Sequence, residues 1–417
     1  MANGSLADLA DTLDAKLAAA DAALADGYPG ERSTRQPVHT VYVPADRFYA
    51  GLVPEWGRAA LASVDADVEG FRAVLSDSPP AVAAGLEQRV RGKLAAEPIE
   101  DLRIDFEDGY GERGDAEEDG AAASAARALT RAIGEGTAPP CHGIRFKSFE
   151  APTRRRGLRT LGLFLEALAA PSGSLPEGFV VTLPKVTSVE QVEAMVFAAT
   201  RLESAIGLAP GSLGFEIQVE TPQAILGPDG AALVARMVHA SEGRCTALHY
   251  GTYDYSASCG IAAEYQSMEH PAADYAKAVM QVAAAGTGVR LSDGSTNVIP
   301  VGEREFVRSA WALHHRLVRR SLERGYYQGW DLHPAQLPTR YAAVFAFYRS
   351  GLDRATDRLR RYVEQTDSGF MDEPATARAL ADFIVRGLDC GAVSMDEVTA
   401  ATGLDSARLW KLARRVP

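Results

Sequence analysis

Short segments that are hydrophobic on both faces alternate along this chain with longer segments in which hydrophobic residues recur at helical spacing. The short segments predict eight strands, at 39–45, 101–108, 142–149, 179–186, 213–221, 246–254, 297–302 (with GVRLSDG just before it) and 326–334. The longer segments predict helices that include 121–134, 155–169, 189–207 and 273–286. Several strands end in a burst of polar residues, which is typical of parallel strands buried beneath helices.

Eight strands that alternate with helices predict a (β/α)8 barrel of the TIM type. A doubly wound open sheet is the alternative, and it fits less well because no GxGxxG motif follows an early strand. We expect an N-terminal helix and linker at 1–36, a catalytic barrel at 37–350 and a helical C-terminal extension at 351–417. The extension contains SMDEVTAATGLDSARLWKLARR, which superficially resembles a helix-turn-helix and which we interpret as a packing or oligomerisation arm.

Composition narrows the class of partner. The 417 residues include 43 Lys and Arg against 55 Asp and Glu, a formal net charge of -12, so the surface repels phosphate backbones and we expect no nucleic acid partner. No run of 18 apolar residues is present, so we expect no membrane partner. The four cysteines lack any metal-binding spacing and the N-terminus lacks the features of a signal peptide, which together favour a cytoplasmic protein.

Carboxylates collect where the predicted strands end. Glu107 and Asp108 follow the second strand, Glu220 ends the fifth and Asp254 ends the sixth. The carboxyl ends of barrel strands meet at one face, so these side chains should converge there. Crowded carboxylates repel one another unless a cation or a bound proton neutralises them, and an all-oxygen donor set favours Mg²⁺ or Mn²⁺.

Basic and polar residues accompany them at the same ends. Arg145 lies on the third strand, Lys185 follows the fourth, Thr221 follows the fifth and Asp331 ends the eighth. Each has a structural alternative, since strand-end residues also cap helices and form ion pairs. Asp105 or Glu107 could pair with a barrel arginine, and Lys185 could be a buried structural lysine. A strand-end lysine could also form a Schiff base, although the carboxylates favour the metal route.

Six motifs in order resemble the citrate lyase β-subunit and HpcH/HpaI aldolase family. They are DFEDGY (105–110), IRF (144–146), LPKV (183–186), VETPQAI (219–225), GTYDYS (251–256) and WDLHPAQ (330–336). The resemblance implies a (β/α)8 barrel and Mg²⁺-dependent (or Mn²⁺-dependent) cleavage or formation of a carbon–carbon bond through an enolate. It implies a 2-oxo acid or acyl-CoA substrate and a homo-oligomer, either a trimer or a hexamer.

The same resemblance implies a role for each matching residue. Glu220 and Asp254 would hold the metal, Arg145 would steady the enolate oxygen, Glu107 and Asp108 would orient it or manage protons, and Lys185, Thr221 and Asp331 would bind substrate. The general base stays open among Glu107, Asp108, Asp331, His333 and a metal-bound hydroxide. The alternatives are a malate synthase-like enzyme that also hydrolyses the thioester, and a non-catalytic barrel that binds a ligand or serves in assembly.

Overall fold

Eight parallel strands form the centre of the molecule, which is a computed structural model that describes residues 3–364 and 373–413. The strands are β1 (His39–Pro44), β2 (Asp101–Asp105), β3 (Cys141–Arg145), β4 (Phe179–Leu183), β5 (Phe215–Val219), β6 (Cys245–Tyr250), β7 (Arg290–Ser292) and β8 (Gly329–Asp331). They are hydrogen-bonded in the order β7-β6-β5-β4-β3-β2-β1-β8. A parallel bridge between Ser292 and Gln328 joins the two ends, so the sheet forms a nearly closed barrel and confirms the predicted fold.

The position of the seventh strand is the one error in the predicted strands. The strand is Arg290–Ser292, inside the GVRLSDG segment, and residues 297–302 form no strand. Pro300 within that segment has no N–H to donate to a sheet ladder. Gly302 has a φ of 106°, in the left-handed region, which also interrupts an extended run.

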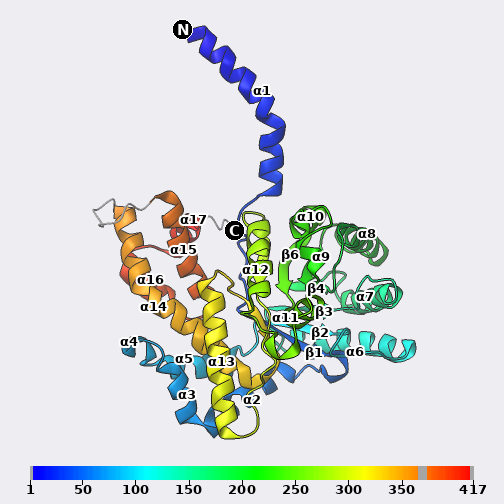
Figure 1. Cartoon of the computed structure of the whole chain (residues 1–417), viewed down its shortest axis with the longest axis vertical. Helices are drawn as coiled ribbons and strands as arrows, with labels where there is room; N and C mark the ends of the chain where they lie inside the picture. Colours follow the sequence, from blue (N-terminus) through cyan, green and yellow to red (C-terminus); the bar gives the residue numbers. More distant parts are fainter. Residues whose placement is uncertain (1–2, 365–372, 414–417) are drawn as a thin grey trace.

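Helices connect the strands and cover the barrel. Between β1 and β2 lie α2 (Leu52–Ala66), α3 (Val68–Leu75), α4 (Pro80–Ala83) and α5 (Leu86–Ala96). The later connections carry α6 (Asp115–Gly134), α7 (Arg154–Ala169), α8 (Val189–Ile206), α9 (Pro222–Ile225), α10 (Leu233–Ala240), α11 (Thr252–Ser258), α12 (Pro271–Ala284) and α13 (Arg304–Glu323). Figure 1 shows α6, α7 and α8 on one side of the strands and α13 on the other. The predicted helices at 121–134, 155–169, 189–207 and 273–286 coincide with α6, α7, α8 and α12.

The C-terminal helices pack on one another beside the barrel. They are α14 (Leu337–Glu364), α15 (Pro374–Asp389), α16 (Met395–Thr402) and α17 (Ser406–Leu412). The long helix α14 contacts α13, α15 and α16, and α15 contacts α17. Leu404 and Leu409, in the segment that resembles a helix-turn-helix, are buried in this packing.

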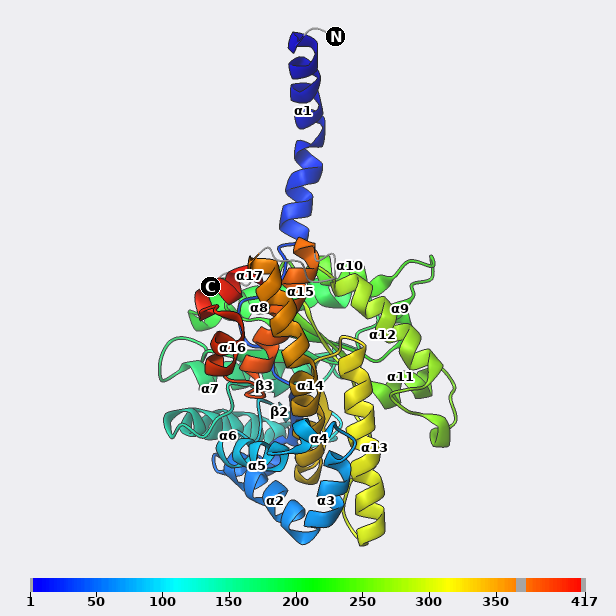
Figure 2. The same ribbon diagram turned by 90° about the vertical axis from the view of Figure 1, so that its left-hand side faces the viewer.

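The N-terminal helix α1 (Asn3–Gly27) projects away from the rest of the molecule (Figures 1 and 2). The segment after it returns to the barrel, where Arg32 donates to the carbonyl oxygens of Gly288 at 2.9 Å and Cys245 at 3.0 Å. Among the helices of residues 3–364 and 373–413, none has the length and apolar character needed to span a membrane.

Candidate active site

Four carboxylates surround one lysine at the carboxyl end of the barrel. The ammonium Nζ of Lys185 lies 2.8 Å from Asp254 Oδ2, 3.0 Å from Asp108 Oδ2 and 3.3 Å from Glu107 Oε1. The backbone N–H of the same lysine donates to Glu220 Oε1 at 2.8 Å. These residues follow β2, β4, β5 and β6, and parallel strands place all four ends at the same face, as predicted.

The backbone of Lys185 has an unusual conformation for this role. Its φ is 52°, in the left-handed region that residues other than glycine enter rarely. This conformation accompanies the hydrogen bond from its N–H to Glu220, while its side chain reaches the other three carboxylates. Backbone strain of this kind costs about 1–3 kcal/mol and is concentrated at functional sites.

Glu220 is close to its neighbours because residue 251 is a glycine. A Cβ at Gly251 would lie 2.5 Å from Glu220 Cβ and 2.6 Å from Glu220 Oε2, which no real side chain tolerates. Gln218, two residues earlier on β5, donates through Nε2 to Glu220 Oε2. The Glu220 carboxylate is therefore held by two hydrogen bonds, from the backbone N–H of Lys185 and from the side chain of Gln218, and it packs against Gly251.

Arg145 is fixed beside this group by a bidentate ion pair. Its Nε and Nη2 each donate to Asp105 at 2.7 Å, and its guanidinium lies 4.7 Å from the ring centre of Tyr42. The remaining nitrogen, Nη1, has longer contacts of 3.4 Å to Gln218 Oε1 and 3.4 Å to Glu107 Oε2. Arg145 thus keeps one nitrogen available for a stronger partner while two hold it in place.

The electrostatics of this group are unbalanced. Five carboxylates meet two cations; the carboxylates are Asp105, Glu107, Asp108, Glu220 and Asp254, and the cations are Arg145 and Lys185. Burial raises the pKa of Glu220 to about 8, and Lys185 offsets only part of this effect. Burial also raises the pKa of Glu107 to about 7, and the neighbouring charge of Asp108 adds to it. A further positive charge would stabilise this arrangement.

The donors present fit a hard divalent cation. Mg²⁺ is usually bound through one or two carboxylates, with water and substrate oxygens completing its shell. Glu220 and Asp254, on neighbouring strand ends, would supply two carboxylates to such a cation, and the Glu107 carboxylate lies nearby. No group of three or more His, Cys, Asp or Glu side chains in the described part of the chain has metal-binding geometry. The two carboxylates would fill two positions of the shell, and water and substrate oxygens would fill the others.

Two candidate substrate ligands, Thr221 and Asp331, make contacts within the protein. Thr221 begins α9, donates through Oγ1 to the carbonyl of Val186 at 2.7 Å and accepts from the N–H of Ala224 at 3.3 Å. These bonds tie the loop after β4 to the end of β5. Thr221 therefore follows Glu220 directly in the sequence, but its hydroxyl is hydrogen-bonded to backbone groups.

Asp331 is not brought to the group around Lys185. Its side chain is fully buried, 2.9 Å from Arg340 Nη2, 3.1 Å from His39 Nδ1 and 3.0 Å from His314 Nε2. Burial alone would raise the pKa of Asp331, but Arg340 and the histidines hold it well below its usual range. The side chain of Asp331 is therefore engaged with these three partners, and its substrate-binding role stays a prediction. His333 accepts from the N–H of Ala335 and so caps a short helix.

Two residues that contact the site were not among the sequence candidates. Gln218 links Arg145 to Glu220, and the alternation of side chains along β5 could have identified it because it lies two residues before Glu220. Tyr42 contributes the face under Arg145 from β1. Nothing in the sequence distinguishes Tyr42 from an aromatic residue of the hydrophobic core, so its contact with Arg145 could not be predicted.

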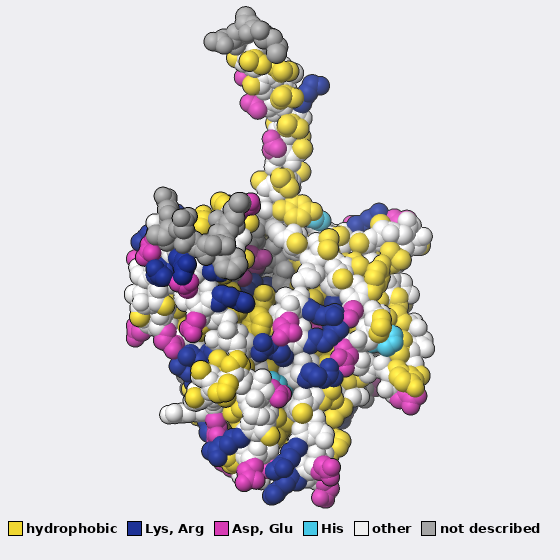
Figure 3. Space-filling view, turned by 60° about the vertical axis from the view of Figure 1, so that its left-hand side comes forward, with side chains coloured by type: hydrophobic (Ala, Val, Ile, Leu, Met, Phe, Trp, Pro, Cys, Tyr) yellow, Lys and Arg dark blue, Asp and Glu magenta, His cyan; other side chains and the backbone are white. Residues whose placement is uncertain are grey.

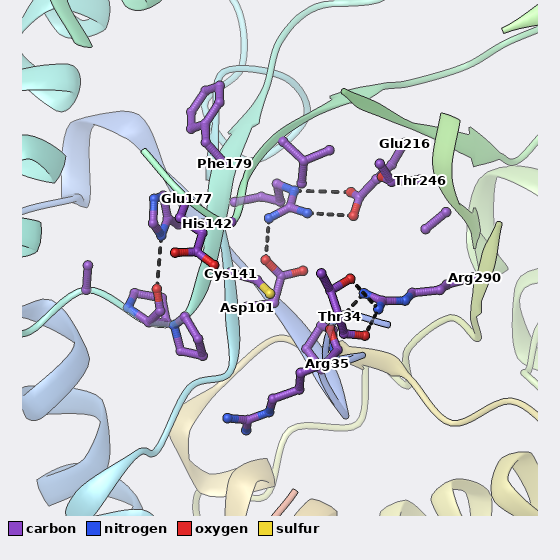
Figure 4. A pocket seen from close by; sticks show the side chains of 18 of the residues that line it. Thr34, Arg35, Asp101, Cys141, His142, Glu177, Phe179, Glu216, Thr246 and Arg290 are labelled. Atoms are coloured by element: carbon purple, nitrogen blue, oxygen red, sulfur yellow. Dashed lines mark hydrogen bonds and ion pairs between the residues drawn. The ribbon is translucent and has the colours of Figure 1, made fainter. Parts of the chain in front are cut away.

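A cavity of about 460 Å³ lies at the amino end of the barrel, opposite this group (Figure 4). Several of its charged side chains are held by partners within the protein. Arg103 donates to Glu216 Oε1 at 2.6 Å and also to Asp101, and Arg290 donates to Thr34 Oγ1 at 2.8 Å. In TIM barrels this face serves stability and the opposite face carries the chemistry, so we place the candidate site at the carboxyl end.

Comparisons with known proteins agree with this fold. Residues 17–416 match the family model described as "Domain of unknown function (DUF6986)". A citrate lyase from Burkholderia xenovorans LB400 superposes with a TM-score of 0.58 at 18% identity, covering 89% of this chain and 100% of that one. A Haloferax volcanii malate synthase in a magnesium and glyoxylate complex gives a TM-score of 0.51 at 14% identity, covering 91% and 98%.

No curated protein sequence matches the chain. At these identities the solved structures establish a shared fold, which confirms at that level the resemblance to citrate lyase-type proteins that the six motifs predict. The family match spans nearly the whole sequence. The chain therefore belongs to the DUF6986 family, on a barrel fold similar to those of citrate lyase and malate synthase.

Proposed function

We propose that this protein is a Mg²⁺- or Mn²⁺-dependent carbon–carbon lyase or aldolase that acts through an enolate on a 2-oxo acid or an acyl-CoA thioester. The observation that carries this proposal is the excess of carboxylates over cations around Lys185. The Haloferax volcanii malate synthase, which shares the fold, is described in complex with magnesium and glyoxylate, and glyoxylate is a 2-oxo acid. This supports a metal and an oxo acid as the ligands of this chain.

The proposed cation would be held by Glu220 and Asp254, and when bound it would withdraw charge from substrate oxygens as a Lewis acid. Arg145 would donate through Nη1 to the oxygen on which charge develops. Its other nitrogens are fixed by Asp105, so this donor is oriented before the reaction begins. Donors arranged in advance contribute roughly 3–4 kcal/mol to transition-state stabilisation.

Glu107 is our candidate for proton transfer. Its pKa is raised to about 7, mainly by burial, so both protonation states are populated near neutral pH. Asp108 has a lowered pKa: burial opposes this, but its contact with Glu107 and the charges of Arg145 and Lys185 outweigh burial. The two adjacent carboxyls therefore divide into one that exchanges a proton and one that stays charged.

Lys185 would act as a cation rather than as a nucleophile. Burial alone would lower its pKa, but Glu220, Glu107 and Asp254 raise it. A lysine that keeps its proton cannot attack a carbonyl to form a Schiff base. We therefore favour charge stabilisation by Lys185 over covalent catalysis.

Exchange of the methyl protons of pyruvate for deuterium tests enolate formation directly. We expect NMR in D2O to show exchange that requires both the protein and Mg²⁺, and that is lost in Asp254→Asn. Glu269→Gln is the matched control, because Glu269 is a surface carboxylate paired with Arg316 at 2.7 Å. Exchange that survives EDTA, or that persists in Asp254→Asn, would contradict the proposal.

A malate synthase-like condensation is the second candidate, favoured by the shared fold with the Haloferax volcanii enzyme. It uses the same enolate chemistry and then hydrolyses a thioester. Incubation with acetyl-CoA, glyoxylate and Mg²⁺ distinguishes the two, because only the condensing enzyme releases free thiol. The partner in either case is a small molecule.

A further inference from the structure

The N-terminal helix carries a hydrophobic stripe that the other described residues of its own chain leave exposed. Leu6, Leu9, Leu13, Leu17 and Leu24 recur at intervals of three, four, four and seven residues, which places them along one side of α1. Each is between 48% and 62% exposed. Every side chain from residue 6 to residue 26 is exposed, because α1 projects away from the barrel (Figure 2).

An apolar groove lies at the base of this helix. It has a volume of about 540 Å³ and runs between α10 and α12; it is lined by Tyr28, Ala232, Ala235, Tyr275, Val279 and Val282. Val282 is 79% exposed and Tyr275 is 53% exposed, although both are hydrophobic. Tyr28 follows α1 directly, so the stripe and the groove form one continuous apolar surface. Figure 3 shows hydrophobic side chains continuing from α1 onto the body.

The charges beside the groove complement those of α1. The helix carries five aspartates and a single lysine. Arg320 of α13 and Arg324 at its end both pair with Asp274 of α12, next to the groove residue Tyr275, at 2.7 and 2.9 Å. Two guanidiniums that share one carboxylate leave positive charge for an incoming acidic helix.

We propose that α1 of one chain docks in the α10–α12 groove of a second copy, and that the two copies exchange these arms. The lengths agree: Leu6 to Leu17 spans about 18 Å and the 14 residues of α12 span about 21 Å. Reciprocal exchange gives a closed, two-fold interface in which each copy contributes both the helix and the groove. This inference does not depend on the proposed reaction.

The same features disfavour a lipid surface as the occupant. Helices that lie on membranes carry Lys and Arg on the polar face, where they attract anionic lipids. The polar face of α1 instead carries aspartates, with Lys16 as its one basic residue. A second copy also supplies a groove of matching length and charge, which a lipid surface does not.

Sedimentation velocity of the full-length protein tests the exchange. We expect an assembly larger than the 44.5 kDa chain, and at least a twofold fall in mass both for Leu9→Gln/Leu13→Gln on the helix and for Val282→Asp in the groove. These positions are exposed, so the variants should fold, which circular dichroism checks. Ala15→Gln/Ala22→Gln on the opposite face of α1 and Phe197→Gln on α8 are the controls and should keep the wild-type mass.

Cross-linking identifies the groove as the docking site. Two chains of different size, one carrying Leu13→Cys and the other Val282→Cys, should form a mixed disulfide when combined, and Ala15→Cys should not; both carry Cys259→Ser to remove the exposed native thiol. A monomeric wild type, an unchanged mass in Val282→Asp, or absence of the mixed disulfide would overturn the proposal. So would leucine-dependent binding to phosphatidylcholine–phosphatidylglycerol vesicles with no change in mass.

Discussion

The two ends of the barrel shift the pKa of a buried glutamate in opposite directions. Glu216, in the interior towards the amino end, pairs with Arg103 at 2.6 Å and lies 3.2 Å from His249; these partners lower its pKa although burial alone would raise it. Glu220, four residues later at the carboxyl end, has its pKa raised to about 8. Both side chains are buried, so burial does not explain the difference.

The difference lies in the supply of positive charge. Glu216 forms a direct ion pair with Arg103, which it shares with Asp101, and it has His249 beside it. Glu220 accepts from the backbone N–H of Lys185 and from Gln218, within a group of five carboxylates that share Arg145 and Lys185. A folded protein that leaves buried acids short of counter-charge sacrifices stability there, and such sites are where a ligand or an ion is expected to bind. This contrast supports a structural role for the amino end and the proposed binding site at the carboxyl end.

The same substitution at the two ends gives the largest test of this contrast. We expect Glu216→Gln to lower the free energy of unfolding by about 3 kcal/mol, because it removes one of the two carboxylates that neutralise buried Arg103. In EDTA, Glu220→Gln should leave stability unchanged or raise it by about 1 kcal/mol, because it removes excess negative charge. Urea denaturation at pH 8 measures both. A similar loss in the two variants would remove the distinction between the ends.

Two adjacent histidines on α13, His314 and His315, extend this comparison of buried groups to the pH dependence of the free energy of unfolding. His314 is paired with Asp331, whereas burial lowers the pKa of His315 to about 4 and no carboxylate pairs with it among the described residues. The unfolded state binds a proton near pH 6.5, so this contribution to stability is present above pH 6.5 and is lost as pH falls towards 4, up to about 3 kcal/mol.

Urea midpoints between pH 4 and 7 measure this effect. The variant His315→Gln should flatten the decline in unfolding free energy below pH 6.5. Equal slopes for wild type and variant would assign the acid sensitivity to other groups.

A substitution of Arg145 tests the proposed role of the carboxyl end through the rate of the reaction rather than through stability. Arg145→Lys keeps the positive charge but loses the planar fork that Asp105 holds. We expect the rate of Mg²⁺-dependent pyruvate exchange to fall about 100-fold, equivalent to about 2.7 kcal/mol. Exchange within threefold of wild type would exclude Arg145 from the reaction.

The convergence of these side chains at the carboxyl end could be predicted from the sequence, because it depends only on which residues follow each strand. Lys185 and the four carboxylates around it each follow a strand, and parallel strands bring such positions together whatever the details of packing. Gln218 was within reach of the same reasoning, since side chains alternate along a strand.

The contacts of Asp331 could not be read from its position at a strand end. Its partners His39, His314 and Arg340 come from three different elements, β1, α13 and α14, and they meet at Asp331 only through the packing of these helices on the barrel. The prediction of the seventh strand at 297–302 was wrong for a different reason. That segment is apolar in composition, as a strand would be, but it contains Pro300 and Gly302, which interrupt extended pairing.

The central claim is that a bound divalent cation neutralises the excess of carboxylates at the carboxyl end, and ligand-dependent thermal unfolding tests it most directly. We would compare wild type, Glu220→Gln and the control Glu269→Gln with Mg²⁺, with oxalate and with both, because oxalate imitates the enolate of pyruvate. A ligand at about 100 times its dissociation constant stabilises the fold by about 2.7 kcal/mol. We predict that oxalate raises the midpoint only with Mg²⁺, in wild type and Glu269→Gln but not in Glu220→Gln. Stabilisation by oxalate in EDTA, or an undiminished Mg²⁺-dependent shift in Glu220→Gln, would contradict the account.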